Sequence, residues 1–210
     1  MSLMENGLCE LDFAKSLELA TRFRLTSLLL DVPGEHTFSE ARDLLPSLPS
    51  STAKSVTMLV EEMVQGYKGL EESYHKILGA GGVVSPFEAD YEPSCLCNNG
   101  PLLADIGGFY KAFGFELTKL CSGNRLDHVA VESAFLAYLY LKFAYAVFSE
   151  MPQFAKITFD AITLFRRDHF DPFLERFLVR LASDVHGHET YKQVADVVHG
   201  LVFKNDANTR

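Results

Sequence analysis

The sequence predicts an all-α fold, a single-domain multi-helix bundle of about eight to nine helices that covers residues 1–210. Apolar residues recur at three- and four-residue spacing in most segments, which is the period of a helix with one buried face. Clean apolar–polar alternation bounded by Asn-Gly or Asp-Gly, the pattern of a β-hairpin, does not occur in the sequence. The chain is 48% hydrophobic and 22% charged, a balance that supplies a sizeable core and argues against wholesale disorder.

The first two helices are predicted near the N-terminus. Residues 8–30 carry the first apolar helical pattern. Thr37 and Glu40 stand at capping-box spacing, where a hydroxyl and a carboxylate satisfy the exposed N–H groups of a first turn. These residues predict that a short second helix starts at Thr37 and runs through Leu45.

A long helical pattern and an irregular loop come next. Residues 51–78 follow helical spacing, but Gly66 and Gly69 weaken the pattern, so that the segment folds as one helix or as two. Residues 79–100 are rich in Gly, Pro and Asn and predict an irregular loop of about 20 residues. A loop of that length inside a compact domain is usually functional or mobile.

The most apolar helix is predicted in the second half of the chain. Residues 102–113 form an amphipathic pattern that Gly114 ends. From Val129 to Ala146 apolar residues follow three-four spacing and also occupy most of the remaining positions, which predicts a central helix buried on most sides. Asp127 stands just before this segment and is predicted to be its N-cap.

Start and stop signals divide the C-terminal part of the chain. Pro152 suits the first turn of one helix, and Asp171-Pro172 combines an N-cap acceptor with a proline at the first position of another. Gly187 is predicted to end that second helix. Residues 190–203 form a last amphipathic helix.

Charge and composition narrow the class of function. The chain carries 28 acidic against 19 basic residues, a net charge of −9. Such a surface disfavours nucleic acid and attracts a cationic peptide. Residues 1–10 lack the features of a secretory signal, and the longest apolar run, residues 134–148, is shorter than the roughly 20 residues of a membrane span. Four cysteines are too few for a disulfide scaffold, so we expect a cytoplasmic protein with no membrane span.

Sequence signals of catalysis are weak. The G-x-S-x-G nucleophile motif and the phosphate-binding G-x-x-x-x-G-K-[ST] motif are both missing from the sequence. Asp127-His128 has the opposite order to the His-Asp pair of metal phosphohydrolases. We therefore expect a protein that binds another polypeptide, without a cofactor, rather than an enzyme.

The alternative to a binding protein is a metal-dependent enzyme built in a helical bundle. Glu72 and His75 match the E-x-x-H pair of di-iron bundles, in which both side chains project inward. Such a site needs further inward carboxylates from other helices. Glu132 is a candidate for one of them, and Asp160 is a poorer one for the other.

A zinc site is the second form of that alternative. Cys95 and Cys97 form a C-x-C pair in the loop, and His186 and His188 form an H-x-H pair near the C-terminus. Together these residues would supply four ligands of the types that zinc prefers. Nothing in the sequence places the two pairs together.

Five stretches of the chain carry a familiar order of motifs. Residues 71–79 are similar to E-x-E-Y-x-x-L-F-x-G, and residues 86–91 to P-Y/W-E-S-x-Y. Residues 102–115 resemble a helix that ends in Y-x-x-x-G-F. Residues 126–132 resemble P-D-H-L-x-x-E, and residues 168–177 resemble E-H-L-x-x-W-x-x-x-F. In this order the motifs resemble those of the TorD/DmsD/NarJ family of molybdoenzyme maturation chaperones.

The chain departs from the family pattern at several positions. It has no Trp, which family members often carry near the peptide site, and Phe87 and Phe173 are candidate substitutes. Leu126 replaces the usual proline before Asp127, and Phe is absent after Leu78. These departures leave the identity of the client and the detail of the groove open.

The resemblance implies a chaperone that binds the N-terminal leader of an apo-molybdoenzyme catalytic subunit, assists cofactor insertion and delays export by the twin-arginine route. A leader with arginines before an apolar run needs carboxylates and an apolar groove. The implied peptide-binding residues are Glu72, Tyr74, Leu78, Pro86, Phe87, Glu88, Tyr91, Asp127, His128, Phe135, Asp168 and His169. A monomer and a dimer that exchanges helices across residues 79–100 both remain open.

Overall fold

The computed structural model describes residues 11–79, 81–92, 98–117, 125–183 and 189–204, and the regular structure in these ranges is helical. An isolated bridge joins Phe87 to His128. The all-α prediction is therefore confirmed. The helices are α2 (Phe13–Leu29), α3 (Glu35–Leu44), α4 (Ser50–Gln65), α5 (Tyr67–Ile77), α6 (Gly100–Phe113), α7 (Val129–Phe148), α8 (Pro152–Phe165), α9 (Asp171–Ser183) and α10 (Glu189–Phe203). Short helical turns are η1 (Leu45–Ser47), η2 (Glu88–Tyr91) and the π-helical η4 (Arg166–Phe170).

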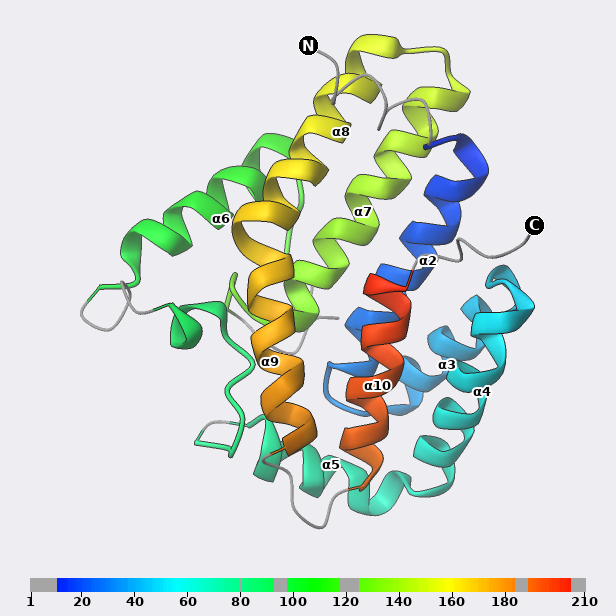
Figure 1. Ribbon diagram of the computed structural model, residues 1–210, viewed down its shortest axis with the longest axis vertical. Helices are drawn as coiled ribbons and strands as arrows, with labels where there is room; N and C mark the ends of the chain where they lie inside the picture. The colour runs from blue at the N-terminus through cyan, green and yellow to red at the C-terminus, as the bar shows by residue number, and fades with distance from the viewer. Residues whose placement is uncertain (1–10, 80, 93–97, 118–124, 184–188, 205–210) are drawn as a thin grey trace.

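The central helix of the bundle is α7, which runs between α2 and α8 (Figure 1). Most of its residues are buried, among them Phe135, Leu139 and Phe143. By length and composition, α7 is the one helix in the described ranges that could cross a membrane. However, 67% of its most apolar stretch is buried inside the bundle, as in the core helix of a globular protein.

Local breaks in the helices follow the glycine and proline signals. Gly66 separates α4 from α5, so residues 51–78 fold as two helices. Gly114 follows α6 in the left-handed conformation, with φ 68° and ψ 33°, which glycine adopts without steric cost. Pro152 occupies the first turn of α8, where no N–H donor is required.

The predicted capping box is wrong, because both of its side chains make other contacts. The N-cap of α3 is Gly34, and Thr37 lies inside the first turn, where its hydroxyl donates to the Val32 carbonyl at 3.3 Å. Glu40 reaches α2 instead and binds Arg24 through two contacts of 2.6 and 2.7 Å. A bidentate ion pair between helices is favoured over the local cap.

The predicted helix start at Asp171 is confirmed as the first residue of α9, but the N-cap role predicted for Asp171 is wrong. The chain remains helical from α8 through η4 into α9, and Asp171 has helical dihedrals. Pro172 cannot donate to the carbonyl four residues earlier, and the wider π-helical turn lies just before it. The Asp171 carboxylate accepts from Arg166 at 3.1 Å rather than capping a new helix. Gly187, the predicted end of this helix, lies outside the described residues.

Candidate functional site

Backbone hydrogen bonds tie the start of α7 to the segment that contains η2. Val129 N donates to the Pro86 carbonyl at 2.9 Å, and Glu88 N donates to the Asp127 carbonyl at 2.9 Å. The Asp127 carboxylate extends this contact by accepting from Ala89 N at 3.2 Å. Residues that lie far apart in sequence therefore share one site at the first turn of the central helix.

Asp127 is fully buried, and its charge is balanced locally. Arg125 donates from Nε to Oδ1 at 2.9 Å and from Nη2 to Oδ2 at 2.7 Å. The same guanidinium lies over the Phe87 ring, 3.9 Å from its centroid. A buried carboxylate requires such a partner, because removal from water penalises an isolated charge.

His128, rather than Asp127, is the N-cap of α7. Its Nδ1 accepts from Ala130 N at 3.1 Å, which requires a neutral ring. Burial, assisted by the charge of Arg125, lowers the pKa of His128 to about 4. The prediction of Asp127 as N-cap is wrong because Arg125 and Ala89 engage its carboxylate. Both Asp127 and His128 are buried, so neither presents its polar group at the surface.

Two more carboxyl groups, those of Glu88 and Glu132, are buried at this end of the bundle. Within the described residues both Glu132 oxygens and Glu88 Oε2 have no hydrogen-bond donor. Burial raises the pKa of Glu132 well above 4.5, and the charges of Glu88 and Asp127 raise it further. Burial therefore favours the protonated, uncharged form of Glu132.

His169, from the π-helical turn η4, connects Glu88 to Asp105. Its Nδ1 lies 3.3 Å from Glu88 Oε1, and its Nε2 lies 3.2 Å from Asp105 Oδ2. The ring packs against Phe109 and Phe165. Burial by itself lowers the pKa of His169, but the hydrogen bonds and charges of Glu88 and Asp105 outweigh burial, so the pKa is raised above 6.5.

A pocket of about 380 Å³ opens beside this histidine, between η2, the start of α6 and η4. Its lining consists of Glu88, Glu92, Asn98, Pro101, Leu102, Asp105, Asp168 and His169. Arginines pair with two of its carboxylates, because Arg176 contacts Glu92 and Arg167 contacts Asp168 at 2.6 Å. The other two carboxylates, on Glu88 and Asp105, face the histidine. An acidic pocket of this kind is suited to a cationic group.

The structure brings some of the predicted peptide-binding residues to this pocket. Glu88, Asp168 and His169 line it directly. Pro86 is buried, and the half-buried Phe87 packs against His128 with ring centroids 5.4 Å apart.

Tyr91 also lies next to the pocket lining in sequence and is half-buried. Its hydroxyl donates to the Ser85 carbonyl at 2.9 Å, and its ring packs against Phe173. The ring therefore braces the loop against α9, and its hydroxyl is already engaged.

Other predicted residues lie away from the pocket lining. Tyr74, Leu78 and Phe135 are core residues with at most 4% of their surface exposed, so the expected groove floor is a packed interior. Glu72 is at the opposite extreme, since its side chain is 71% exposed and pairs with Lys76 at 2.7 Å.

The di-iron alternative requires inward-facing ligands that the structure does not provide at its E-x-x-H pair. Glu72 and His75 are both exposed, and Asp160 pairs with Lys156 at 2.8 Å. Glu132 is buried, but beside Glu88. Within the ranges that the structure describes, no group of three or more His, Cys, Asp or Glu could hold a metal ion. The predicted zinc ligands, Cys95, Cys97, His186 and His188, lie outside those ranges.

Sequence reasoning missed Arg125 and Asp105 as members of the site. Arg125 stands two residues before Asp127, so a basic residue beside a buried acid was an available signal. Asp105 lies 64 residues from His169, and no local pattern connects them. The contact depends on how α6 packs beside η4.

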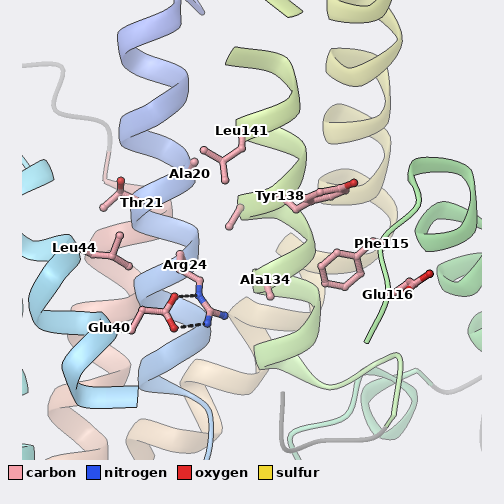
Figure 2. Close-up of a pocket in the computed structure, with 11 residues that line it drawn as sticks. Ala20, Thr21, Arg24, Glu40, Leu44, Phe115, Glu116, Ala134, Tyr138 and Leu141 are labelled. Carbon is pink, nitrogen blue, oxygen red and sulfur yellow. Dashed lines mark hydrogen bonds and ion pairs between the residues drawn. The ribbon is translucent and has the colours of Figure 1, made fainter. Parts of the chain in front are cut away.

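A second pocket, of about 410 Å³, lies between α2, α7 and the segment after α6 (Figure 2). Its lining is mostly apolar and consists of Ala20, Thr21, Arg24, Glu40, Leu44, Phe115, Glu116, Ala134, Ala137, Tyr138 and Leu141. Figure 2 shows the bidentate Arg24–Glu40 pair at one side of this groove. The hydrogen bond from Arg24 outweighs burial and lowers the pKa of Glu40.

The sequence of the chain matches that of a known protein family. A family model described as nitrate reductase delta subunit matches residues 45–179. The matched range contains the start of α7 and also η2, α6 and η4, between which the acidic pocket lies. No curated protein and no solved structure matches the chain.

Proposed function

The chain belongs to the nitrate reductase delta subunit family, and from that premise we propose that it is a maturation chaperone that binds the N-terminal leader of a molybdopterin-containing oxidoreductase catalytic subunit. The family match confirms the resemblance to the TorD/DmsD/NarJ chaperones. The chaperone holds the leader during cofactor insertion and delays the transport of an exported client. It acts by binding, in the cytoplasm, and is not an enzyme.

The observation that carries this proposal is the acidic pocket at η2, α6 and η4. A leader arginine carries a planar, permanently charged guanidinium that binds carboxylates through paired hydrogen bonds. Glu88 and Asp105 offer carboxylate oxygens from two different segments, and His169 lies between them. The pocket therefore has the chemistry expected for the cationic part of a leader.

The buried residues of the family signature support the pocket rather than contact the leader. Asp127 holds Ala89 and Arg125, and His128 caps α7. These bonds fix the backbone that carries Glu88, so their loss displaces the pocket lining. In this proposal the contacts with the leader come from Glu88, Asp105 and Asp168, and the aromatic Phe87 and Tyr91 lie next to the pocket in sequence.

The test is recovery of a client from the native cell. The tagged full chain is used to capture partners, and the bound proteins are identified by mass spectrometry. We expect the catalytic subunit of a molybdopterin oxidoreductase, and we expect a synthetic peptide of its first residues to compete for binding. Capture of that subunit without competition by the leader peptide would contradict the leader-binding step.

Charge-matched variants connect the capture to the pocket. Asp105→Asn removes one negative charge from the pocket lining, and Glu116→Gln removes one from the lining of the apolar groove. We expect Asp105→Asn to reduce recovery of the client and Glu116→Gln to leave it unchanged. Equal losses in both variants would indicate that net charge alone drives the association.

A further inference from the structure

His169 occupies a position that a cationic ligand of the pocket would also need. Its two ring nitrogens face Glu88 Oε1 and Asp105 Oδ2 at 3.3 and 3.2 Å. Arginines pair with Glu92 and Asp168 in the same lining, whereas Glu88 and Asp105 have this histidine between them. When protonated, the imidazolium donates to both carboxylates and neutralises part of the pocket.

Besides Phe109 and Phe165, which pack against its ring, His169 has charged groups from several elements around it. Glu88 comes from η2, Glu92 directly follows η2, and Asp105 comes from α6. Glu132 and the Asp127–Arg125 pair lie behind Glu88 at the start of α7. On its own turn, Arg166 pairs with Asp171, and Arg167 pairs with Asp168. Within the described residues, two carboxylates without an arginine partner therefore face one titratable ring.

We propose that the pocket takes one guanidinium group at Glu88 and Asp105 in exchange for the proton of His169. The assignment of the ligand as a leader arginine rests on the proposed function. The exchange itself is expected with any guanidinium compound. His169 is then an internal competitor of the ligand: protonated, it occupies both carboxylates, and neutral, it leaves them to an incoming cation.

The buried oxygen of Glu88 is the second reason to place a ligand here. Its side chain is 2% exposed, it lines the pocket, and its Oε2 has no donor among the described residues. Burial favours the protonated form of Glu132 behind it, and one proton cannot satisfy every oxygen of the pair. A guanidinium carries five N–H donors in a fixed fork, enough to serve Glu88 and Asp105 together.

Charge is conserved in the exchange. Before binding, the site contains an imidazolium and two carboxylates; after binding, it contains a guanidinium, a neutral imidazole and the same two carboxylates. The proton leaves His169 for the solvent, so binding is linked to the release of one proton at a pH where the ring is charged in the free protein. The raised pKa of His169 extends that range above pH 6.5.

NMR of the histidine Cε1–Hε1 groups tests the exchange directly in the full chain. The His169 resonance is assigned by its loss in His169→Gln, and it is titrated in methylguanidinium chloride and in sodium chloride of equal ionic strength. We expect methylguanidinium to lower the midpoint of the His169 titration by roughly one pH unit. An unchanged midpoint would overturn the exchange, whatever the chain binds in the cell.

Measurements of peptide binding at two pH values test the proton exchange and the proposed leader binding independently. The probes are a synthetic peptide with two adjacent arginines before an apolar run, and the same peptide with citrulline, the uncharged analogue, at both positions. We expect the arginine peptide to bind at least about tenfold more tightly near pH 8 than near pH 5.5, and the His169→Gln chain to lose most of that difference. Binding of equal strength at both pH values would overturn the exchange and leave leader binding intact.

A second variant keeps the test decisive where His169→Gln fails to fold. Asp105→Asn changes a largely exposed carboxylate, so the core is untouched. We expect it to lower the midpoint of the free His169 titration and to weaken the effect of methylguanidinium. If methylguanidinium shifts His169 in the wild type but the arginine peptide binds at neither pH, the exchange stands and the leader assignment fails.

Discussion

The two pockets have similar volumes, about 380 and about 410 Å³, but they handle charge in opposite ways. The acidic pocket combines carboxylates with a titratable histidine above buried Glu132. The groove between α2 and α7 is mostly apolar, and Arg24 and Glu40 neutralise each other beside it. A cation therefore gains more in the first pocket, where two carboxylates face a histidine rather than any arginine that the structure describes.

The difference also concerns how each charge is held in place. Asp127 is fully buried and bonds to the backbone of another segment as well as to Arg125. Glu40 is partly exposed and bonds to one arginine. Burial makes the polar network at the start of α7 costly to break, whereas solvent can replace much of the Arg24–Glu40 pair.

The largest expected effect comes from Asp127→Ala. The change leaves Ala89 N without its acceptor, deprives Arg125 of its carboxylate and opens a small cavity, so we expect the free energy of unfolding to fall by about 3 kcal/mol. Urea denaturation measures it. The comparison variant is Glu40→Ala, for which we expect a loss below about 1 kcal/mol. Equal losses would break the distinction between the two pockets.

The second prediction concerns acid sensitivity at His128. Its folded-state pKa, about 4, lies below 6.5. As pH falls below 6.5, His128 becomes protonated in the unfolded chain but stays neutral in the folded chain. This residue therefore makes folding less favourable at lower pH. Between pH 7 and 5 this contribution amounts to about 2 kcal/mol.

His128→Asn isolates that contribution. Asn is a good N-cap acceptor and does not titrate, so the variant keeps the bond to Ala130 N and loses the pH dependence. The titrations of Glu132 and His169 occur in both proteins and largely cancel in the difference. Thermal or urea unfolding at several pH values gives the two curves, and parallel curves would show that His128 is not held neutral.

The third prediction locates cation binding in one pocket. We expect Asp105→Asn to weaken binding of the arginine peptide roughly fivefold near pH 8, because one of the two carboxylates that face His169 is lost. Ala137→Leu, which fills part of the apolar groove, should change that affinity by less than about twofold. Isothermal titration calorimetry measures both. A larger effect of Ala137→Leu would move the binding site to the groove.

Local features of the fold could be predicted from the sequence because their causes are local. Gly66 and Gly114 end helices through backbone freedom, and Pro152 begins one because it lacks an N–H. The predicted caps at Thr37 and Asp171 failed because the two side chains bond to Val32 and Arg166 instead, at a spacing that the capping patterns do not include.

The candidate site could be predicted only in part. The resemblance selected Glu88, Asp127 and His169 as members of one site, but it could not separate buried from exposed side chains. Burial depends on the packing of η2 against α7, which joins residues 38 positions apart through the Ala89–Asp127 bond. Asp105 could not be predicted for the same reason, because its partner His169 lies 64 positions away in the sequence.

The smallest expected effect is that of Glu72→Gln. This variant is the charge-matched control for Asp105→Asn in the acidic pocket. Glu72 and Asp105 are both largely exposed carboxylates, so their neutral variants change the net charge of the chain by the same amount. Glu72 is absent from the lining of the acidic pocket and pairs with Lys76 on its own helix. The hydrogen bond from Lys76 lowers the pKa of Glu72, so the residue is ionised at neutral pH.

At physiological ionic strength the Debye length is about 8 Å, so an exposed charge beyond that distance from a bound cation is largely screened. We therefore expect Glu72→Gln to leave the melting temperature and the affinity for the arginine peptide unchanged, within about 1.5-fold, while Asp105→Asn weakens that affinity. Calorimetry at low and at physiological salt checks the reasoning. A small effect of Glu72→Gln that appears only at low salt reflects long-range attraction. A loss as large as that of Asp105→Asn at physiological salt would restore Glu72 as a binding residue.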